Sequence, residues 1–180
     1  MIQQTFKYFD ISPDAIINNE FPGFKEDYLI LDSLLRKYKP ESVFEIGCNF
    51  GTGTNIICNA LPDAKVFSLD MPYGRGDLPL YSGGKDHTGQ NCKLPFTLLR
   101  GDSTEFDYSK YPCQAYFVDA GHFYENVLIE TKKVLAEKPL IVIYHDSDIP
   151  EVMQGILDGM NEGYELYRVT DTRIAYLLIK

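Results

Sequence analysis

Short apolar runs alternate with helical patterns along most of this chain. Apolar runs occur at residues 43–46, 65–69, 96–100, 115–118, 139–144, 164–169 and 173–179, and apolar residues with helical spacing occur at 24–38, 52–61, 123–137 and 150–161. Alternating strands and helices are typical of right-handed crossovers and a mostly parallel sheet. Residues 170–172 join the last two runs, a hairpin-length link that makes the final strand antiparallel to its neighbour. The pattern predicts an α/β fold with helices on both faces of a seven-stranded sheet, in which five parallel strands are closed by an antiparallel hairpin.

Length, composition and charge narrow the class of protein further. The chain has 180 residues, of which 44% are hydrophobic and 24% charged, values that suit one folded domain over residues 1–180. No apolar run approaches the roughly 18 residues that cross a bilayer, and no signal peptide is visible, so we expect a cytoplasmic protein with no membrane partner. Because the net charge is −9 and no Lys/Arg cluster occurs, nucleic acid is an unfavourable partner. The four cysteines form no C-x-x-C pair, and we expect them to be reduced and structural.

The segment 43–70 carries the strongest chemical signal. An apolar run that includes Glu45 is followed by a glycine-bearing turn at 47–53, a helical pattern and a second apolar run that ends at Asp70. This order is where an open parallel sheet binds a nucleoside-containing cofactor. The spacing is not G-x-G-x-x-G, and an acid two residues before the first glycine repels phosphate at close range and attracts a cation or amine. The loop therefore favours a cofactor that carries positive charge over one that carries two phosphates.

Three later strand ends also carry polar side chains. The third parallel run leads into Asp102 and Ser103, a pair that is also common at a helix N-cap. The fourth leads into Asp119, with His122 three residues later, and the fifth leads into a His-Asp pair at 145–146. Because the carboxyl ends of parallel strands meet at one edge of a sheet, we expect Asp119 and this His-Asp pair around one pocket.

Two of these motifs resemble those of a known family. The stretch Glu-x-Gly-x-Asn-x-Gly at 45–51, with an acid ending the next strand, resembles motif I and the ribose acid of class I S-adenosylmethionine-dependent methyltransferases. The stretch Asp-Ala-Gly-His-Phe-Tyr-Glu at 119–125 resembles the Asp-Gly-x-His-x-Tyr-Glu segment of small O-methyltransferase-like proteins, often grouped as methyltransferase family 24. The resemblance covers roughly residues 40–148 and implies the Rossmann-like class I methyltransferase fold. The chain departs from the family pattern at Asn49, where glycine is commoner, and at 137–139, where Pro-Gly-Gly is usual.

The resemblance implies S-adenosylmethionine as the cofactor. By analogy with the family, Glu45 is expected near the amino group of the methionine moiety, Asp70 at the ribose hydroxyls and Asp102 at the adenine amino group. The implied cofactor-binding residues, in chain order, are Glu45, Gly47, Asn49, Gly51, Asp70, Met71, Asp102, Ser103 and Asp119.

The polar strand ends leave two interpretations of the chemistry. Divalent-metal O-methyltransferases place oxygen ligands at matching strand ends, so Asp119, His145 and Asp146 correspond to ligands of a divalent metal. An imidazole in place of the usual acid at 145 suits transition metals better than magnesium. In the metal-free interpretation, His122 or His145 is the catalytic base, since a histidine with a pKa near 6.5 can take a proton at neutral pH. His122 matches the base position of catechol-type enzymes; alternatively, it is a helix-start histidine bonded to the backbone.

We therefore expect methyl transfer from S-adenosylmethionine to an oxygen of a small polar acceptor. The alternatives are an NAD-dependent oxidoreductase on a similar sheet and a non-catalytic S-adenosylmethionine-binding protein. Residues 1–25 are expected to form a short helical arm over the cofactor side of the sheet, and the irregular loop 71–95 is either a substrate-covering lid or a passive insertion. Such segments build acceptor pockets, and because neither matches the family, the sequence names neither the acceptor nor the oligomeric state.

Overall fold

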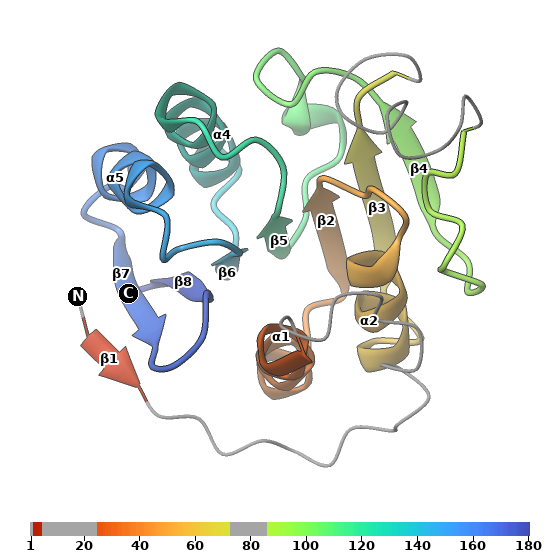
Figure 1. The fold of residues 1–180 in the computed structure, drawn as a ribbon, viewed down its shortest axis with the longest axis horizontal. Coiled ribbons are helices and arrows are strands. Elements are labelled where there is room, and N and C mark those ends of the chain that lie inside the picture. Colours follow the sequence, from red (N-terminus) through yellow and green to blue (C-terminus); the bar gives the residue numbers. More distant parts are fainter. Residues whose placement is uncertain (1, 5–24, 73–85) are drawn as a thin grey trace.

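The computed structural model describes residues 2–4, 25–72 and 86–180, which form one sheet flanked by helices (Figure 1). The strands are β1 (Ile2–Gln4), β2 (Ser42–Ile46), β3 (Lys65–Asp70), β4 (Thr97–Arg100), β5 (Ala115–Val118), β6 (Ile141–Tyr144), β7 (Tyr164–Val169) and β8 (Ala175–Ile179). The helices are α1 (Lys25–Tyr38), α2 (Thr52–Ala60), α4 (Tyr124–Ala136), α5 (Pro150–Gly159) and the short 3-10 helix η3 (Tyr108–Lys110). The apolar pattern predicted the bounds of β2–β8 and of the four α-helices to within about two residues.

The order of the strands confirms the predicted topology. Within the described ranges the order is β1-β7-β8-β6-β5-β2-β3-β4. Strands β6, β5, β2, β3 and β4 are parallel neighbours, whereas β8 runs antiparallel to both β6 and β7. Apart from β1, this is the predicted seven-stranded, mostly parallel sheet with a C-terminal antiparallel hairpin.

The N-terminal residues differ from the prediction. Residues 2–4 form strand β1, which pairs parallel to β7 with Ile2 opposite Tyr167, so the helical arm expected over 1–25 is wrong for these three residues. The edge of β7 offers backbone donors and acceptors, and pairing with β1 satisfies them. Residues 5–24 of the expected arm, and residues 73–85 of the expected lid, lie outside the described residues.

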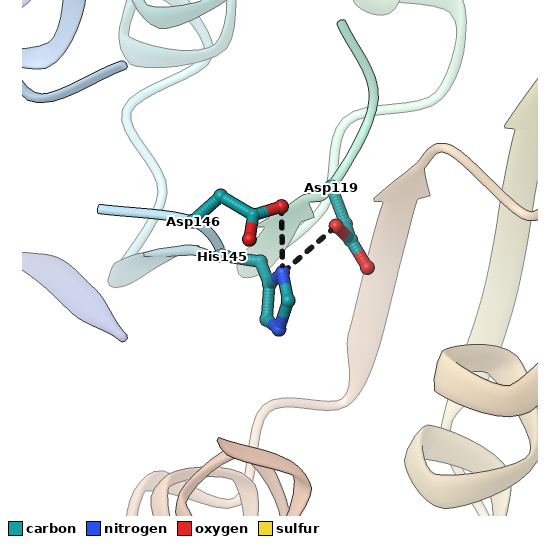
Figure 2. Close-up of side chains that lie close together, drawn as sticks. All are labelled: Asp119, His145 and Asp146. Carbon is teal, nitrogen blue, oxygen red and sulfur yellow. Dashed lines mark ion pairs between the residues drawn. The ribbon is translucent and has the colours of Figure 1, made fainter. Parts of the chain in front are cut away.

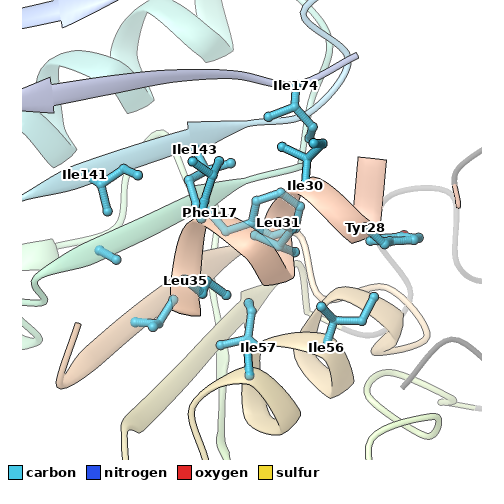
Figure 3. Close-up of a cluster of buried hydrophobic side chains, with 14 of the residues drawn as sticks. Tyr28, Ile30, Leu31, Leu35, Ile56, Ile57, Phe117, Ile141, Ile143 and Ile174 are labelled. Carbon is cyan, nitrogen blue, oxygen red and sulfur yellow. The ribbon is translucent and has the colours of Figure 1, made fainter. Parts of the chain in front are cut away.

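Helices cover both faces of the sheet, as predicted. On one face, apolar side chains of α1 and α2 pack against those of β2, β5 and β6, including Leu31, Ile57, Phe117 and Ile143 (Figure 3). On the other face, α4 and α5 pack against the same strands around Tyr116 and Tyr144. Both cores are closed to solvent at the centre of the sheet, which leaves its carboxyl edge as the place where polar side chains of the strand ends meet.

The cysteines and the lengths of the helices complete the description of the fold. All four cysteines are buried free thiols, which agrees with their predicted structural role. No helix in the described parts of the chain combines the length and apolar character that crossing a membrane requires.

Candidate active site

A cavity of about 510 Å³ lies at the carboxyl edge of the sheet. Its walls come from α1, the glycine-bearing turn, the ends of β5 and β6, and the β7–β8 hairpin. The lining residues are Tyr28, Gly47, Cys48, Asn49, Phe50, Thr52, Gly53, Asp119, Ala120, His122, His145, Asp146 and Arg173. The structure therefore brings the glycine turn and the predicted catalytic and metal residues to one cavity, of a size that suits a small-molecule ligand.

The glycine turn has the backbone conformation that its sequence predicts. Gly47, Asn49 and Gly51 all have left-handed φ angles, of +97°, +46° and +86°. A Cβ atom at Gly47 would lie 2.0 Å from the carbonyl oxygen of Asp119, so only glycine lets the turn approach the end of β5. Gly51 instead faces Gly89, whose Cα would lie 2.7 Å from an added Cβ. Gly47 and Asn49 thus line the cavity, whereas Gly51 packs closely against the backbone of Gly89.

Glu45 lies beneath the turn rather than in the cavity wall. Its side chain is buried, and its Oε2 accepts hydrogen bonds from the hydroxyls of Thr54 and Ser68. Its Oε1 has no hydrogen-bond partner among the described residues and would lie 2.5 Å from a Cβ at Gly53. Burial raises the pKa of the Glu45 carboxyl well above its usual range. The structure therefore places a buried acid with a raised pKa under the glycine turn.

Asp70 is held at the end of β3 by backbone donors. The N–H of Asn49 donates to Oδ2 at 2.6 Å, and the N–H of Met71 donates to Oδ1 at 2.7 Å. Burial raises the pKa of Asp70 despite these hydrogen bonds. Arg100 donates to the carbonyl of Met71 at 3.0 Å, which ties the ends of β3 and β4 together. Asp70 and Met71 therefore sit beside the glycine turn, next to but outside the residues that line the cavity.

Asp102 and Ser103 make contacts within the protein that the sequence could not distinguish from ligand contacts. Oδ1 of Asp102 accepts from the N–H and hydroxyl of Thr104, at 2.9 and 2.7 Å, and so closes a turn. The hydroxyl of Ser103 donates to Glu130 at 2.5 Å. Burial raises the pKa of Glu130 to about 7. Neither Asp102 nor Ser103 lines the cavity.

The ends of β5 and β6 bring two carboxylates to one ring nitrogen. Nδ1 of His145 lies 2.9 Å from Oδ2 of Asp146 and 3.2 Å from Oδ1 of Asp119, as the dashed lines in Figure 2 show. Burial alone would lower the pKa of His145, but the neighbouring carboxylates outweigh it and raise the pKa to about 11. These three residues are the predicted metal ligands, and their ligand atoms all lie within 4.8 Å of one another.

His122 joins the same cluster from the start of α4. Its Nε2 lies 2.8 Å from Oδ2 of Asp146, and its side chain is 52% exposed, so it is open to a ligand in the cavity. The hydrogen bond to Asp146 raises the pKa of His122. Burial tends to raise the pKa of Asp146, yet hydrogen bonds from His122 and His145 hold it well below its usual range. His122 is thus paired with a carboxylate at the cavity.

Three further residues of the site were not predicted from the sequence. Asp27 and Tyr28, from the first turn of α1, and Arg173, from the β7–β8 hairpin, surround His145. The Tyr28 ring stacks on the His145 ring with centroids 6.2 Å apart. Burial raises the pKa of the Tyr28 hydroxyl, so it stays neutral. Asp27 is 2% exposed although it is charged, and a charge on the buried face of a predicted helix was the one signal that could have drawn attention to it.

Comparison with known proteins identifies the fold. No family model matches the sequence, and no curated protein is similar to it in sequence. Among solved structures, the chain is similar to CalS11, a TDP-rhamnose 3′-O-methyltransferase of calicheamicin biosynthesis, with 18% identity, a TM-score of 0.60 and coverage of 94% of this chain and 88% of that one. It is also similar to the methyltransferase PaMTH1 of Podospora anserina, solved with S-adenosylhomocysteine, with 15% identity, a TM-score of 0.62 and coverage of 94% and 89%.

A third similar structure includes a metal. The mycinamycin methyltransferase MycE, in complex with Mg, S-adenosylhomocysteine and mycinamycin VI, is 14% identical, with a TM-score of 0.55 and coverage of 87% of this chain and 49% of that one. These likenesses, with the strand order described above, show that the chain has the class I methyltransferase fold.

Proposed function

We propose that this protein is an S-adenosylmethionine-dependent methyltransferase that transfers a methyl group to an oxygen of a small polar acceptor. One observation carries the proposal: a single cavity joins the left-handed glycine turn to the cluster of His122, His145 and Asp146. A cofactor held along the turn would present its reacting end to a carboxylate-supported histidine. The small-molecule acceptors named for CalS11 and MycE support the same class of substrate.

The residues present fit this cofactor. Gly47 and Asn49 offer backbone without obstructing side chains, and Asp70 has a fixed orientation because each of its oxygens accepts one backbone N–H. Each carboxylate oxygen retains a second lone pair with which to accept a ribose hydroxyl. Glu45 and Gly51 support the glycine turn from behind the cavity wall. Met71, Asp102 and Ser103 keep the cofactor-binding role that the resemblance implies, at the ends of β3 and β4. Asp119 would face the reacting end.

The chain supplies the base and its alignment. When bound, S-adenosylmethionine supplies an electrophilic methyl group on a sulfonium, which the acceptor oxygen attacks. Nε2–H of His122 donates to Asp146, which leaves Nδ1 to take the proton of the acceptor hydroxyl. Asp146 stabilises the imidazolium that results, and the cavity walls align the acceptor oxygen.

A divalent metal fits the same cluster. One ring nitrogen and two carboxylates offer ligand atoms that all lie within 4.8 Å of one another, close enough to share one ion. Asp119, His145 and Asp146 would hold the metal, and the metal would lower the pKa of an acceptor hydroxyl.

Radiolabelled methyl transfer tests the proposal against its two alternatives. Wild-type protein is incubated with methyl-labelled S-adenosylmethionine and a panel of small hydroxyl compounds, with amines in parallel, and NADH absorbance is followed in separate reactions. Label in a hydroxyl acceptor, with no change in NADH, is expected. Turnover of NADH would favour the NAD-dependent oxidoreductase, and cofactor binding without label transfer to any acceptor would favour the non-catalytic S-adenosylmethionine-binding protein.

A further inference from the structure

Two residues from distant parts of the chain meet behind His145. Asp27 belongs to the first turn of α1, and Arg173 belongs to the β7–β8 hairpin, 146 positions later. Oδ2 of Asp27 accepts from Nε and Nη2 of Arg173, at 2.9 and 2.7 Å, and its Oδ1 accepts from the backbone N–H of Arg173 at 2.9 Å. The Asp27 side chain is 3% exposed and that of Arg173 is 22% exposed. A largely buried ion pair with three hydrogen bonds fixes both side chains.

This ion pair faces the nitrogen of His145 that the metal ligands do not use. Asp119 and Asp146 both approach Nδ1, and Figure 2 shows the second ring nitrogen pointing away from them. That nitrogen, Nε2, lies 3.4 Å from Oδ2 of Asp27 and 3.3 Å from Nη2 of Arg173. A guanidinium can only donate, so Nη2 of Arg173 bonds to Nε2 when that nitrogen carries no proton, whereas Oδ2 of Asp27 accepts from Nε2–H when it carries one. A cation held between Asp119 and Asp146 would take the lone pair of Nδ1, and the one proton of the neutral ring would then lie on Nε2, toward Asp27.

Arg173 also orients Asp146. Its Nη1 donates to Oδ1 of Asp146 at 3.0 Å, whereas Oδ2 of the same carboxylate faces His145 and His122. The hairpin therefore determines which oxygen of Asp146 is presented to the cavity. The backbone of Asp146 has a left-handed φ of +54°, a conformation that Asp adopts more readily than most residues.

We propose that Asp27 and Arg173 are the positioning residues of a site for a divalent first-row transition metal. In this site Nδ1 of His145 ligates with Asp119 and Asp146, Asp27 holds His145 through Nε2–H, and Arg173 holds both Asp27 and Asp146. This inference deepens the proposed function and rests on it only for the use of the metal in methyl transfer. The imidazole ligand favours first-row transition-metal ions over Mg²⁺, and Mn²⁺, which also suits the two carboxylates, serves as the probe. Carboxylates that hold a ligating histidine by its second nitrogen typically strengthen metal binding by about 10- to 100-fold.

The test measures metal binding directly. Chelator-treated protein is titrated with Mn²⁺ and the free ion is counted by electron paramagnetic resonance, with Mg²⁺ added as competitor. Wild-type protein is expected to bind one Mn²⁺, to keep it in excess Mg²⁺, and to give a nitrogen coupling in pulsed spectra. Asp27→Asn and Arg173→Met are each expected to weaken Mn²⁺ binding by about 10-fold or more, and Arg173→Lys by less.

A matched control comes from the same helix. Arg36 of α1 pairs with Asp32 at 2.8 Å and lies outside the cavity, so Arg36→Met removes an ion pair of α1 without touching the site. Arg36→Met is expected to bind Mn²⁺ like the wild type. Circular dichroism checks that each variant is folded; if Asp27→Asn unfolds, Arg173→Met and Arg173→Lys carry the comparison.

Repeating the Asp27 substitution in a His145→Asp variant shows whether Asp27 acts through His145. In His145→Asp, the nitrogen coupling is expected to disappear and the preference for Mn²⁺ over Mg²⁺ to shrink. Adding Asp27→Asn to His145→Asp should then change Mn²⁺ affinity by less than about 3-fold, because no Nε2–H remains to be held. An equal loss in both backgrounds would overturn the positioning role of Asp27.

Other outcomes separate this inference from the proposed function. S-adenosylhomocysteine binding is measured by calorimetry on the same samples. If the wild type binds S-adenosylhomocysteine but not Mn²⁺, or binds Mn²⁺ without a nitrogen coupling, the metal site is overturned and the methyltransferase proposal stands. If it binds Mn²⁺ as described but no S-adenosylhomocysteine, the site is supported and the methyltransferase proposal fails. Equal Mn²⁺ affinity in Arg173→Met and Arg36→Met would overturn the role of Arg173.

Discussion

Glu45 and Asp146 are both acids near the carboxyl ends of parallel strands, β2 and β6, which β5 separates, yet their surroundings make them chemically different. Glu45 is 1% exposed and receives hydroxyl donors, so burial dominates and its pKa rises. Asp146 is 8% exposed, and although burial tends to raise its pKa, hydrogen bonds from His122 and His145 lower it. The comparison teaches that the partners of a strand-end acid, more than its depth, decide whether it carries charge. We call the glycine turn with Glu45 beneath it the neutral half of the site, and the cluster of His122, His145 and Asp146 the charged half.

The largest expected effect is on turnover, when both histidines of the charged half are replaced. Substituting His122 and His145 together by Ala should lower turnover by about 10²- to 10⁴-fold, since the base is lost. S-adenosylhomocysteine affinity should change little, because the glycine turn is intact. Labelled methyl transfer and calorimetry on the same variant check both parts, and unchanged turnover would refute the assignment of the base.

Gly47 packs against the backbone of Asp119 and so joins the glycine turn to the end of β5. Substituting Gly47 should therefore destabilise the fold. Gly47→Ala combines a φ of +97° with a Cβ atom 2.0 Å from the Asp119 carbonyl oxygen, so we expect a loss of about 3 kcal/mol in the free energy of unfolding. Gly163→Ala is the control, since an added Cβ there meets only the Asn161 side chain at 3.1 Å. Urea denaturation measures both, and equal losses would contradict close contact between the turn and β5.

The pH dependence of turnover reports on the charged half. If neutral His122 is the base, kcat should rise with pH, with a midpoint above the ordinary histidine value of 6.5, because Asp146 raises the pKa of His122. Asp146→Asn should move this midpoint to lower pH and reduce kcat. A pH–rate profile of both proteins checks the shift, and a midpoint that moves upward would contradict the pairing.

The smallest expected effect is on the pH dependence of stability, through Glu45 in the neutral half. The raised pKa of Glu45 means that the folded state retains a proton that the unfolded state loses above about pH 4.5, so stability falls as pH rises from there to the folded pKa. Glu45→Gln keeps the shape and removes this titration, so the stability of the variant relative to the wild type should rise with pH. Thermal melts from pH 4.5 to 8 measure it. Glu125→Gln, at an exposed position, is the control. If Glu45→Gln instead loses stability relative to the wild type as pH rises, Glu45 carries charge in the folded state.

The fold was predictable because its signal is local. Strands β2–β8 and the four α-helices each have a repeating apolar pattern, and the link at 170–172 identified the hairpin. Strand β1 was missed because three residues are too short to carry such a pattern, and its pairing depends on the distant edge of β7.

The candidate site was predictable where topology alone brings residues together. Strand ends of a parallel sheet converge, so Asp119, His145 and Asp146 could be placed around one pocket. The ion pair of Asp27 with Arg173 could not be predicted, because it joins residues 146 positions apart through the packing of α1 against the hairpin. The burial of Glu45 likewise depends on Thr54 and Ser68, which other elements supply.

A crystal structure with S-adenosylhomocysteine bound tests the central claim most directly, that the neutral glycine-turn half and the charged half form one cofactor site. We predict that the ribose lies at Asp70, that the methionine moiety follows the turn at Gly47, and that the sulfur faces Asp119 and His122. A ligand bound elsewhere, such as the separate cavity beside Arg36 and Pro62, or no bound ligand at millimolar concentration, would contradict the claim.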